Sequence, residues 1–198
     1  MATKAEITSM FIIEKVAPIF NKLGYEATSM SDITKATGLT KGAIYGNFKN
    51  KEHLAIEVFN YNIRKVLWKM ADEINIEETA SAKLQAMTNF YRKYYNHVID
   101  FGGCPLMNVG VDTNNMNPVF HTRVVTILKK LQINIGTIIQ QGIDTEEFKS
   151  NLDAKQLGAR IISHIHGAIF TSVMLKDPIH ITDMMGFLDT MIEKELKN

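Results

Sequence analysis

The side chains best suited to chemistry in this sequence lie between Thr28 and Phe48, in a pattern that predicts two short helices joined by a tight turn at Gly38. A helix-turn-helix needs a small residue at that turn, because its second helix crosses the first at a steep angle. It also needs a cap that leaves the N-terminus of the second helix facing a DNA groove, and Thr40 supplies this cap. The outward residues of the second helix are then Lys41, Gly42 and Tyr45, and the inward ones are Ala43, Ile44 and Phe48. The pattern therefore predicts the reading of double-stranded DNA.

Patterns that would indicate an enzyme, a metal site or a cofactor are missing from the sequence. It has no nucleophile elbow, no P-loop and no glycine pattern for a dinucleotide. His164 and His166 are two residues apart, hence on different faces of a helix, so that one metal ion could not easily bind both. We therefore predict a protein that is not an enzyme and has no metal and no cofactor. The remaining alternative is an enzyme or a structural helical protein with an incidental helix-turn-helix, which steeply salt-dependent binding to its own upstream DNA would exclude.

The distribution of charge adds weak support for DNA binding. The formal net charge is +1, which argues neither for nor against a nucleic-acid partner. Residues 1–65 hold 9 Lys and Arg against 6 Asp and Glu, whereas the rest of the chain holds 13 against 15. This basic bias at the N-terminal end suits a DNA-reading module, although it would not establish one.

The single cysteine, Cys104, rules out an intrachain disulfide and favours a reducing compartment. The sequence has no apolar run of 18 residues and no signal-peptide core at its N-terminus. We therefore predict a cytoplasmic, soluble protein without a membrane partner.

Apolar residues recur at intervals of three and four along the chain, which predicts an all-α fold. We expect an N-terminal three-helix helix-turn-helix domain in residues 1–65 and a C-terminal helical bundle for ligand binding and dimerisation in residues 66–198. Ser29 with Asp32 is a predicted capping box, and Pro18 should kink the first helix without breaking it. The expected helices span about 4–23, 30–37, 41–47, 51–71, 81–101, 118–141, 154–175 and 182–196, with a further one starting near Pro105.

Residues 24–33 and 37–54 are similar to the DNA-binding domain of the TetR family of transcriptional regulators. The aromatic residue at 45, Phe48 and the run Lys51-Glu52-x-Leu54 fall where that family has them. Two residues depart from the pattern: Asn47 stands where many relatives have His or Tyr, and Pro18 is unusual for the family at large. The departure at Asn47 leaves the identity of that phosphate contact open.

The resemblance implies a role for each polar residue of the motif. Lys41 and Gly42 would lie in the major groove, where Lys41 can donate to guanine O6 and N7, and Tyr45 would contact a phosphate or a thymine methyl group. The implied phosphate contacts are Thr28, Ser29, Thr40, Asn47 and Lys51. The alternative is that Ser29, Thr40 and Asn50 are only helix caps, a role that is compatible with phosphate contact.

A weaker resemblance covers the rest of the chain. Residues 103–108 and 142–148, followed by Leu152-Asp153, are similar to a TetR subgroup with a Gly-Cys motif before its sixth helix. The resemblance implies a homodimer formed by the last two helices, and a pseudo-palindromic operator to match it. Small residues among the aliphatic ones from Leu157 to Ser172 would let two helices approach closely, and the alternative is a helix of the chain's own core. The predicted interface is Leu157, Ile161, Ile165, Ala168, Ile169, Ser172, Phe187, Leu188 and Met191.

A pocket for a small-molecule inducer is expected between the middle helices. The aromatic residues and methionines of these helices favour a mostly apolar ligand, which would release a repressor from its operator. The alternative is that these residues only form the hydrophobic core, as such residues usually do. An activator, or a regulator without a ligand, is the alternative among regulators. The candidate lining is Phe90, Tyr94, Cys104, Met107, Asn108, Val111, His121, Val125, His164 and Phe170.

Cys104 carries one further hypothesis. It follows two glycines and precedes a predicted helix N-terminus, where backbone N–H groups and the helix dipole stabilise a thiolate. An accessible thiolate could react with electrophiles or oxidants and thereby sense them. The alternative is a small buried residue that packs a helix start, as free cysteines usually do.

Overall fold

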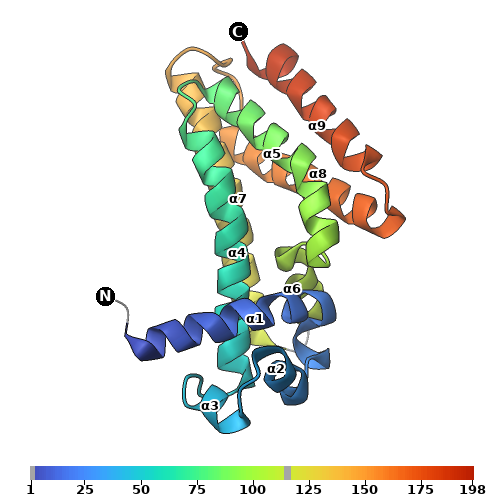
Figure 1. Ribbon diagram of the computed structural model, residues 1–198. Helices are drawn as coiled ribbons and strands as arrows, with labels where there is room; N and C mark the ends of the chain where they lie inside the picture. Colours follow the sequence, from blue (N-terminus) through green and yellow to red (C-terminus); the bar gives the residue numbers. More distant parts are fainter. Residues whose placement is uncertain (1–2, 114–116) are drawn as a thin grey trace. The chain divides into compact units, whose positions relative to one another are not determined.

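The computed structural model describes residues 3–113 and 117–198, and the described part is helical almost throughout (Figure 1). None of the described helices is long and apolar enough to cross a membrane. The helices are α1 (Lys4–Ala27), α2 (Met30–Thr37), α3 (Lys41–Tyr45), α4 (Lys51–Asn75), α5 (Ala80–Phe101), α6 (Pro105–Thr113), α7 (Pro118–Asp144), α8 (Ala154–Leu175) and α9 (Ile179–Met191), followed by a π-helical turn η1 (Ile192–Leu196). The predicted all-α class is confirmed.

The chain divides into two compact units. Unit 1 contains residues 1–66 together with 101–124, and unit 2 contains residues 67–100 together with 125–198. The N-terminal part of unit 1 ends at residue 66, close to the boundary expected at 65/66. Unit 1 also contains α6 and the first residues of α7, which were predicted to belong to the second domain. The separation into a DNA-binding domain, residues 1–65, and a ligand-sensing and dimerisation domain, residues 66–198, stays a prediction.

Helix α1 begins with a capping box in which Thr3 and Glu6 bond each other's backbone N–H groups. It passes through Pro18 with helical dihedral angles, and its non-helical residue is Gly24, with φ +82°. Only glycine adopts this angle without strain. Val16 and Phe20 are buried, whereas Leu23 is 53% exposed. The reason is that Gly24 interrupts the helix directly after Leu23.

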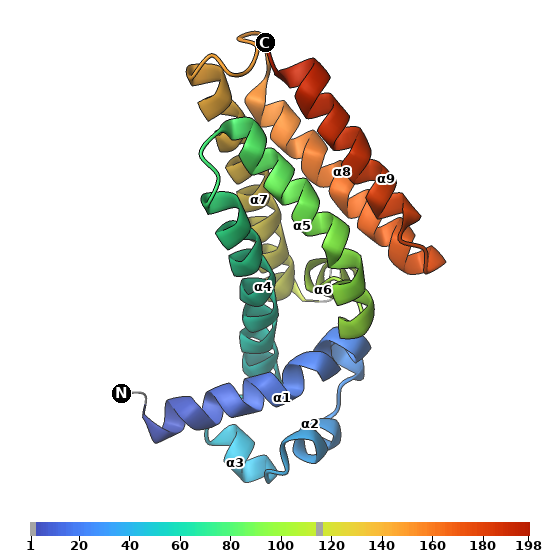
Figure 2. The ribbon, with the colours of Figure 1, turned by 45° about the horizontal axis from the view of Figure 1, so that its top comes forward.

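Two short helices, α2 and α3, follow and lie beside α1 in both ribbon views (Figures 1 and 2). Their caps are those the sequence predicts: Ser29 with Asp32 for α2, and Thr40, whose Oγ1 accepts from Ala43 N at 3.2 Å, for α3. Gly38 has φ +69° and donates its N–H to Thr34 O, which closes α2. Helix α3 ends at Tyr45, two residues earlier than expected.

The segment after α5 packs onto α1 within unit 1. Gly102 and Gly103 both have positive φ angles and separate α5 from α6. Asn21 Nδ2 donates to Phe101 O at 2.7 Å and to Gly103 O at 2.9 Å, and Asn108 Nδ2 donates back to Asn21 O at 2.9 Å. These reciprocal amide bonds satisfy buried backbone carbonyls and fasten the start of α6 to α1.

Unit 2 is held by contacts between residues far apart in the sequence. Glu147 accepts from the N–H groups of Ala80 and Ser81 at 2.8 and 2.9 Å and so caps α5. Burial raises the pKa of Glu147, but the hydrogen bonds from Ser81 and Ala80 outweigh this effect and hold the pKa below its usual 4.5. Helices α8 and α9 run side by side (Figure 2), and the fully buried Ser172 accepts from Ile181 N at 3.0 Å.

Candidate DNA-binding surface

Helix α3 exposes most of its residues to solvent and buries one of them, Ile44. Ile44 is 1% exposed and Phe48, just beyond the helix, is 3% exposed, so these two residues fix the helix to unit 1. Lys41, Gly42 and Tyr45 are exposed, as predicted from the sequence. Ala43 is exposed as well, although the sequence pattern placed it inward. With only five residues, α3 has one inward position, and Ile44 occupies it.

Neither the backbone conformation nor the packing of the described residues requires a glycine at position 42. Its φ angle is not positive, and a Cβ atom there would meet only Thr40 Oγ1, at 3.9 Å. A glycine inside a helix costs about 1 kcal/mol relative to alanine, because it loses more backbone freedom on folding. The open surface at Gly42 therefore suits a close approach by something outside the protomer.

The two hydroxyl residues that precede α2 differ in exposure, since one is an exposed helix cap and the other is buried. Ser29 is exposed, and its hydroxyl donates to Asp32 at 2.6 Å while accepting from Asp32 N at 3.2 Å. The hydrogen bonds from the Ser29 side chain and backbone hold the pKa of Asp32 below its usual value. Thr28, by contrast, is 0% exposed and donates its hydroxyl to Gly24 O at 2.7 Å. That hydroxyl is bonded inside the chain, so the predicted phosphate contact of Thr28, which stays a prediction, would require this bond to break.

Asn47 and Lys51 also bind groups of unit 1. Asn47 Oδ1 accepts from Ser9 Oγ at 3.0 Å and Asn47 Nδ2 donates to Ala43 O at 2.9 Å, which ties α1 to the end of α3. The Lys51 ammonium lies 4.5 Å from the centre of the Tyr25 ring. Both side chains therefore position the motif, and a phosphate contact would have to compete with these bonds.

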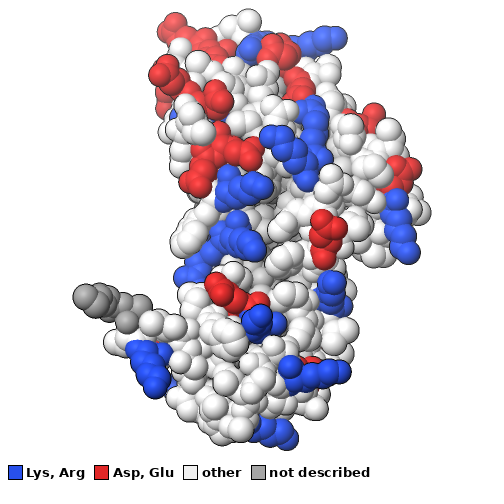
Figure 3. All heavy atoms as spheres, in the orientation of Figure 1, with Lys and Arg blue, Asp and Glu red and all other residues white. Residues whose placement is uncertain are grey.

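The surface over α2 and α3 is mostly uncharged on the face that Figure 3 shows, with separate basic side chains and no acidic cluster. Attraction of DNA by a dense basic patch is therefore not the main property of this face. For recognition of a DNA sequence, the shape of this surface and a few well-placed side chains would matter more than overall charge. The reason is that base contacts specify a sequence, whereas phosphate contacts only position the protein.

The ten candidate ligand residues are divided between the two units. Cys104, Met107, Asn108, Val111 and His121 belong to unit 1, and Phe90, Tyr94, Val125, His164 and Phe170 belong to unit 2. Phe90 and Tyr94 are buried with their rings stacked 5.7 Å apart. Val111 is 79% exposed and Phe170 is 52% exposed, so these two face solvent in the protomer. The predicted ligand site stays a prediction.

Cys104 is 7% exposed and lies directly before α6. This burial contradicts the accessible thiolate and matches the alternative of a small residue that packs a helix start. Among the described residues, no group of three or more His, Cys, Asp or Glu could hold a metal ion.

Most of the predicted interface residues lie inside the protomer. Ile161, Ile165, Ala168, Ile169, Ser172, Leu188 and Met191 are all buried by the chain's own helices. Of the remaining two, Phe187 is 50% exposed and Leu157 is half-buried. Gly158 shows why one side of α8 is internal: a Cβ there would lie 2.4 Å from Gln132 O of α7. The apolar side chains that α8 leaves in solvent are Phe170, Met174 and Leu175, at 52%, 60% and 63% exposed.

Two family models match this chain. One describes bacterial regulatory proteins of the tetR family and matches residues 12–58. The other describes the C-terminal domain of tetracyclin repressor-like proteins and matches residues 80–188. Together they include α2, α3 and the whole of α5 to α8.

Curated proteins and solved structures agree with these models. The chain is 26% identical over 165 residues to the fatty acid metabolism regulator protein of Bacillus subtilis, covering 83% of each. Among solved structures, it is 31% identical to a TetR family transcriptional regulator from Cytophaga hutchinsonii, with a TM-score of 0.91 and coverage of 100% and 98%. A TetR transcriptional regulator from Chloroflexus aurantiacus is 30% identical, with a TM-score of 0.92 and 98% of each chain covered.

Proposed function

The chain belongs to the TetR family of DNA-binding transcriptional regulators, and we propose that it is a homodimeric repressor that a small, mostly apolar ligand releases from a pseudo-palindromic operator. The observation that carries this proposal is the exposed row Lys41, Gly42 and Tyr45 on a helix that is capped by Thr40 and anchored by Ile44. Family membership says that the protein regulates transcription. The geometry of the site supports the proposal that Lys41, Gly42 and Tyr45 touch DNA.

DNA recognition in this proposal uses three kinds of contact. Lys41 donates to base edges, and Tyr45, which is 47% exposed, contacts a phosphate or a thymine methyl group. Gly42 lets the helix backbone approach the groove, since the nearest described atom to a Cβ there would be Thr40 Oγ1, at 3.9 Å. Thr40 can donate its hydroxyl hydrogen to a phosphate while its oxygen caps α3, whereas Ser29 must first release the hydrogen bond that it donates to Asp32.

Dimerisation is supported by the apolar side chains that the protomer leaves exposed on α8 and α9. Phe170, Met174, Ile179 and Phe187 are each at least half exposed. Burial of the exposed half of one such side chain contributes roughly 1 kcal/mol, about half the value for full burial, which favours a partner subunit over solvent. A two-fold dimer presents two copies of α3 to two symmetric half-sites, and the operator is therefore pseudo-palindromic.

Release by a ligand is supported by the composition of the middle helices. Phe90 and Tyr94 of α5 are buried aromatic residues, and in this proposal the ligand displaces packed side chains to reach them. The printed name of the Bacillus subtilis relative links that protein to fatty acid metabolism, a process with apolar metabolites. A ligand that weakens DNA binding must itself be bound more weakly by the DNA complex, by the same factor.

The test is selection of bound DNA from a random pool by the full chain, followed by location of the selected sequence in the source genome. We expect a palindromic consensus whose affinity falls steeply with salt. The Lys41→Ala, Tyr45→Ala double variant is the matched control and should enrich no consensus. Equal enrichment by the native chain and the double variant would remove α3 from the proposal, and a non-symmetric consensus would remove the dimer.

A further inference from the structure

Unit 1 contains a small cavity between its helices. Its lining comes from α1, α4, α6 and the start of α7, all within the same unit. Four aromatic rings, three aliphatic side chains and a proline make most of the wall apolar, and two asparagines supply the polar groups. The lining residues are Phe20, Asn21, Tyr25, Ala55, Val58, Phe59, Asn62, Pro105, Val109 and Phe120.

One wall of this cavity carries a buried acceptor without a partner. Asn62 is 4% exposed, and its Nδ2 donates to Ala17 O at 3.3 Å. Its Oδ1 is buried and accepts no hydrogen bond from any described residue. A buried acceptor left unpaired is costly, and most such groups in folded proteins have a protein or water partner.

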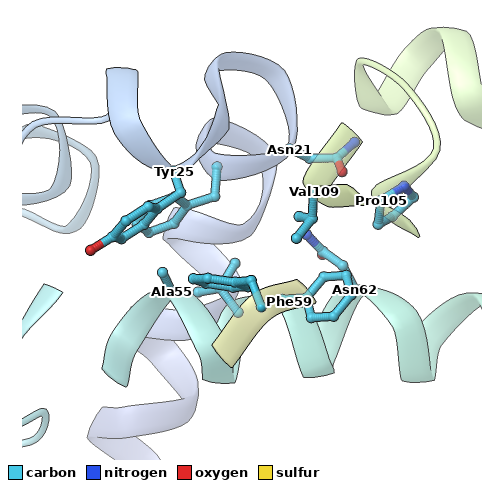
Figure 4. Close-up of a pocket in the computed structure, with 10 residues that line it drawn as sticks. Asn21, Tyr25, Ala55, Phe59, Asn62, Pro105 and Val109 are labelled. Carbon is cyan, nitrogen blue, oxygen red and sulfur yellow. The ribbon is translucent and has the colours of Figure 1, made fainter. Parts of the chain in front are cut away.

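The other polar groups nearby do not supply the missing donor. Asn21 donates its Nδ2 to Phe101 O and Gly103 O. Figure 4 shows the Tyr25 hydroxyl directed away from the Asn62 amide, while Val109 and Phe59 lie close to it. No described residue therefore supplies the donor for Asn62 Oδ1, and a small molecule from solvent can supply it.

The size of the cavity limits what that donor can be. The volume is about 20 Å³. A water molecule needs roughly 10–15 Å³ on this measure, together with polar partners. A single molecule of this size fits, whereas an organic ligand does not.

We propose that this cavity is a binding site for one water-sized hydrogen-bond donor, held by Asn62 Oδ1, which completes the packing of α6 and the start of α7 against α1 and α4. The ligand class is water or the ammonium ion, which has the same size and donates in the same way. Aromatic rings on the cavity wall would tolerate either one, since a ring face attracts a cation and also accepts weakly from water. The site does not depend on the repressor function proposed above.

A crystal structure of the native full chain tests occupancy directly. We expect a density peak about 2.6–3.2 Å from Asn62 Oδ1, inside the cavity. An empty cavity, or an Asn62 side chain turned onto a protein donor, overturns the proposal.

A double-mutant cycle tests the energetic role in solution. Val109→Ile adds one methyl group to the cavity wall and should expel the bound donor, which leaves Asn62 Oδ1 unpaired. The melting temperature should fall by roughly 2–10 °C in the native background and by less in an Asn62→Leu background, which has no acceptor to orphan. Val111→Ile is the matched control on the same helix, because Val111 is 79% exposed, and it should leave the melting temperature unchanged. Equal shifts for Val109→Ile in both backgrounds would mean that no donor is bound there.

The identity of the donor follows from a change of salt. Melting of the native chain and of Asn62→Leu is compared in sodium chloride and in ammonium chloride at equal ionic strength. A higher melting temperature in ammonium chloride for the native chain alone identifies ammonium. Identical melting in the two salts, with the density present, identifies water.

Discussion

The helix-turn-helix of unit 1 and the helices of unit 2 are built by different kinds of contact. In unit 1, Ser29 caps α2 through Asp32 and Thr40 caps α3 through Ala43, so each partner is three residues away. In unit 2, Glu147 caps α5 from more than 60 residues away. The first kind of contact depends on spacing in the sequence, and the second depends on tertiary packing. Substitutions in unit 1 should therefore act locally on DNA binding, whereas those in unit 2 should act on the whole fold.

The sharpest test of this difference is a charge on the buried side of α8. Ile165→Asp should unfold unit 2, because Ile165 is 0% exposed and a buried unpaired carboxylate costs several kcal/mol. Circular dichroism at 25 °C and thermal melting measure the loss. The same substitution at Phe170, which is 52% exposed on α8, should keep the helical signal and weaken dimerisation in sedimentation experiments. A well-folded Ile165→Asp protein would contradict the assignment of this face to the core.

Recognition should fail in unit 1 without loss of the fold. Lys41→Ala or Tyr45→Ala should reduce operator affinity by about 1–3 kcal/mol, roughly ten- to a hundredfold, with melting almost unchanged. Fluorescence anisotropy with labelled operator at fixed salt measures the effect. Lys129→Ala, an exposed lysine of α7, is the control and should bind operator like the native chain. Unaltered affinity in both α3 variants would show that another surface reads the DNA.

The long-range cap of α5 should make unit 2 sensitive to acid. The folded-state pKa of Glu147 lies below 4.5, so its contribution to stability is complete above pH 4.5 and is lost as the pH falls through the folded value. Glu147→Gln should lower the free energy of unfolding by roughly 1 kcal/mol at neutral pH, as loss of a helix cap does. Urea unfolding at pH 7 and below pH 4.5 should show that the difference between variant and native chain shrinks in acid. A pH-independent difference would mean that the carboxylate charge is not what stabilises α5.

The smallest effect is expected at Cys104. Because this thiol is 7% exposed, it should resist alkylation in the native chain and react after denaturation. Mass spectrometry after a timed pulse of iodoacetamide at neutral pH measures labelling. Cys104→Ser should bind operator and respond to an inducer as the native chain does. Rapid native labelling that also releases DNA would restore the hypothesis of a thiol sensor.

Sequence spacing was most informative where a feature depends on neighbouring residues. The caps Ser29, Thr40 and Asn50, the turn at Gly38 and the exposed Lys41 and Tyr45 all follow from it. It was least informative at residues whose environment comes from elsewhere in the chain. Thr28 is of a type suited to phosphate contact, yet it is buried, and Asn47 is bonded by Ser9 of α1.

Helix α8 shows why periodicity could not assign the interface. Its aliphatic residues repeat at intervals of four, from Leu157 to Ile169, and that pattern requires only that the face be buried. The close approach of Gln132 O to Gly158 shows that α7 of the same chain lies against one side. Phe170 and Phe187 stay exposed in the protomer, and the proposed dimer would bury them against a partner subunit.

The sequence by itself determined the helical class, the position of the helix-turn-helix and the residues that its second helix displays. These features rest on hydrogen bonds and φ angles within a few residues, which residue types and spacing specify directly. The tertiary structure alone decided that α6 joins unit 1, that one side of α8 is internal, and that Asn62 faces a cavity with an unpaired acceptor. Those outcomes depend on which surfaces meet across long stretches of chain, and many arrangements bury the same apolar pattern equally well until the packing of side chains selects one.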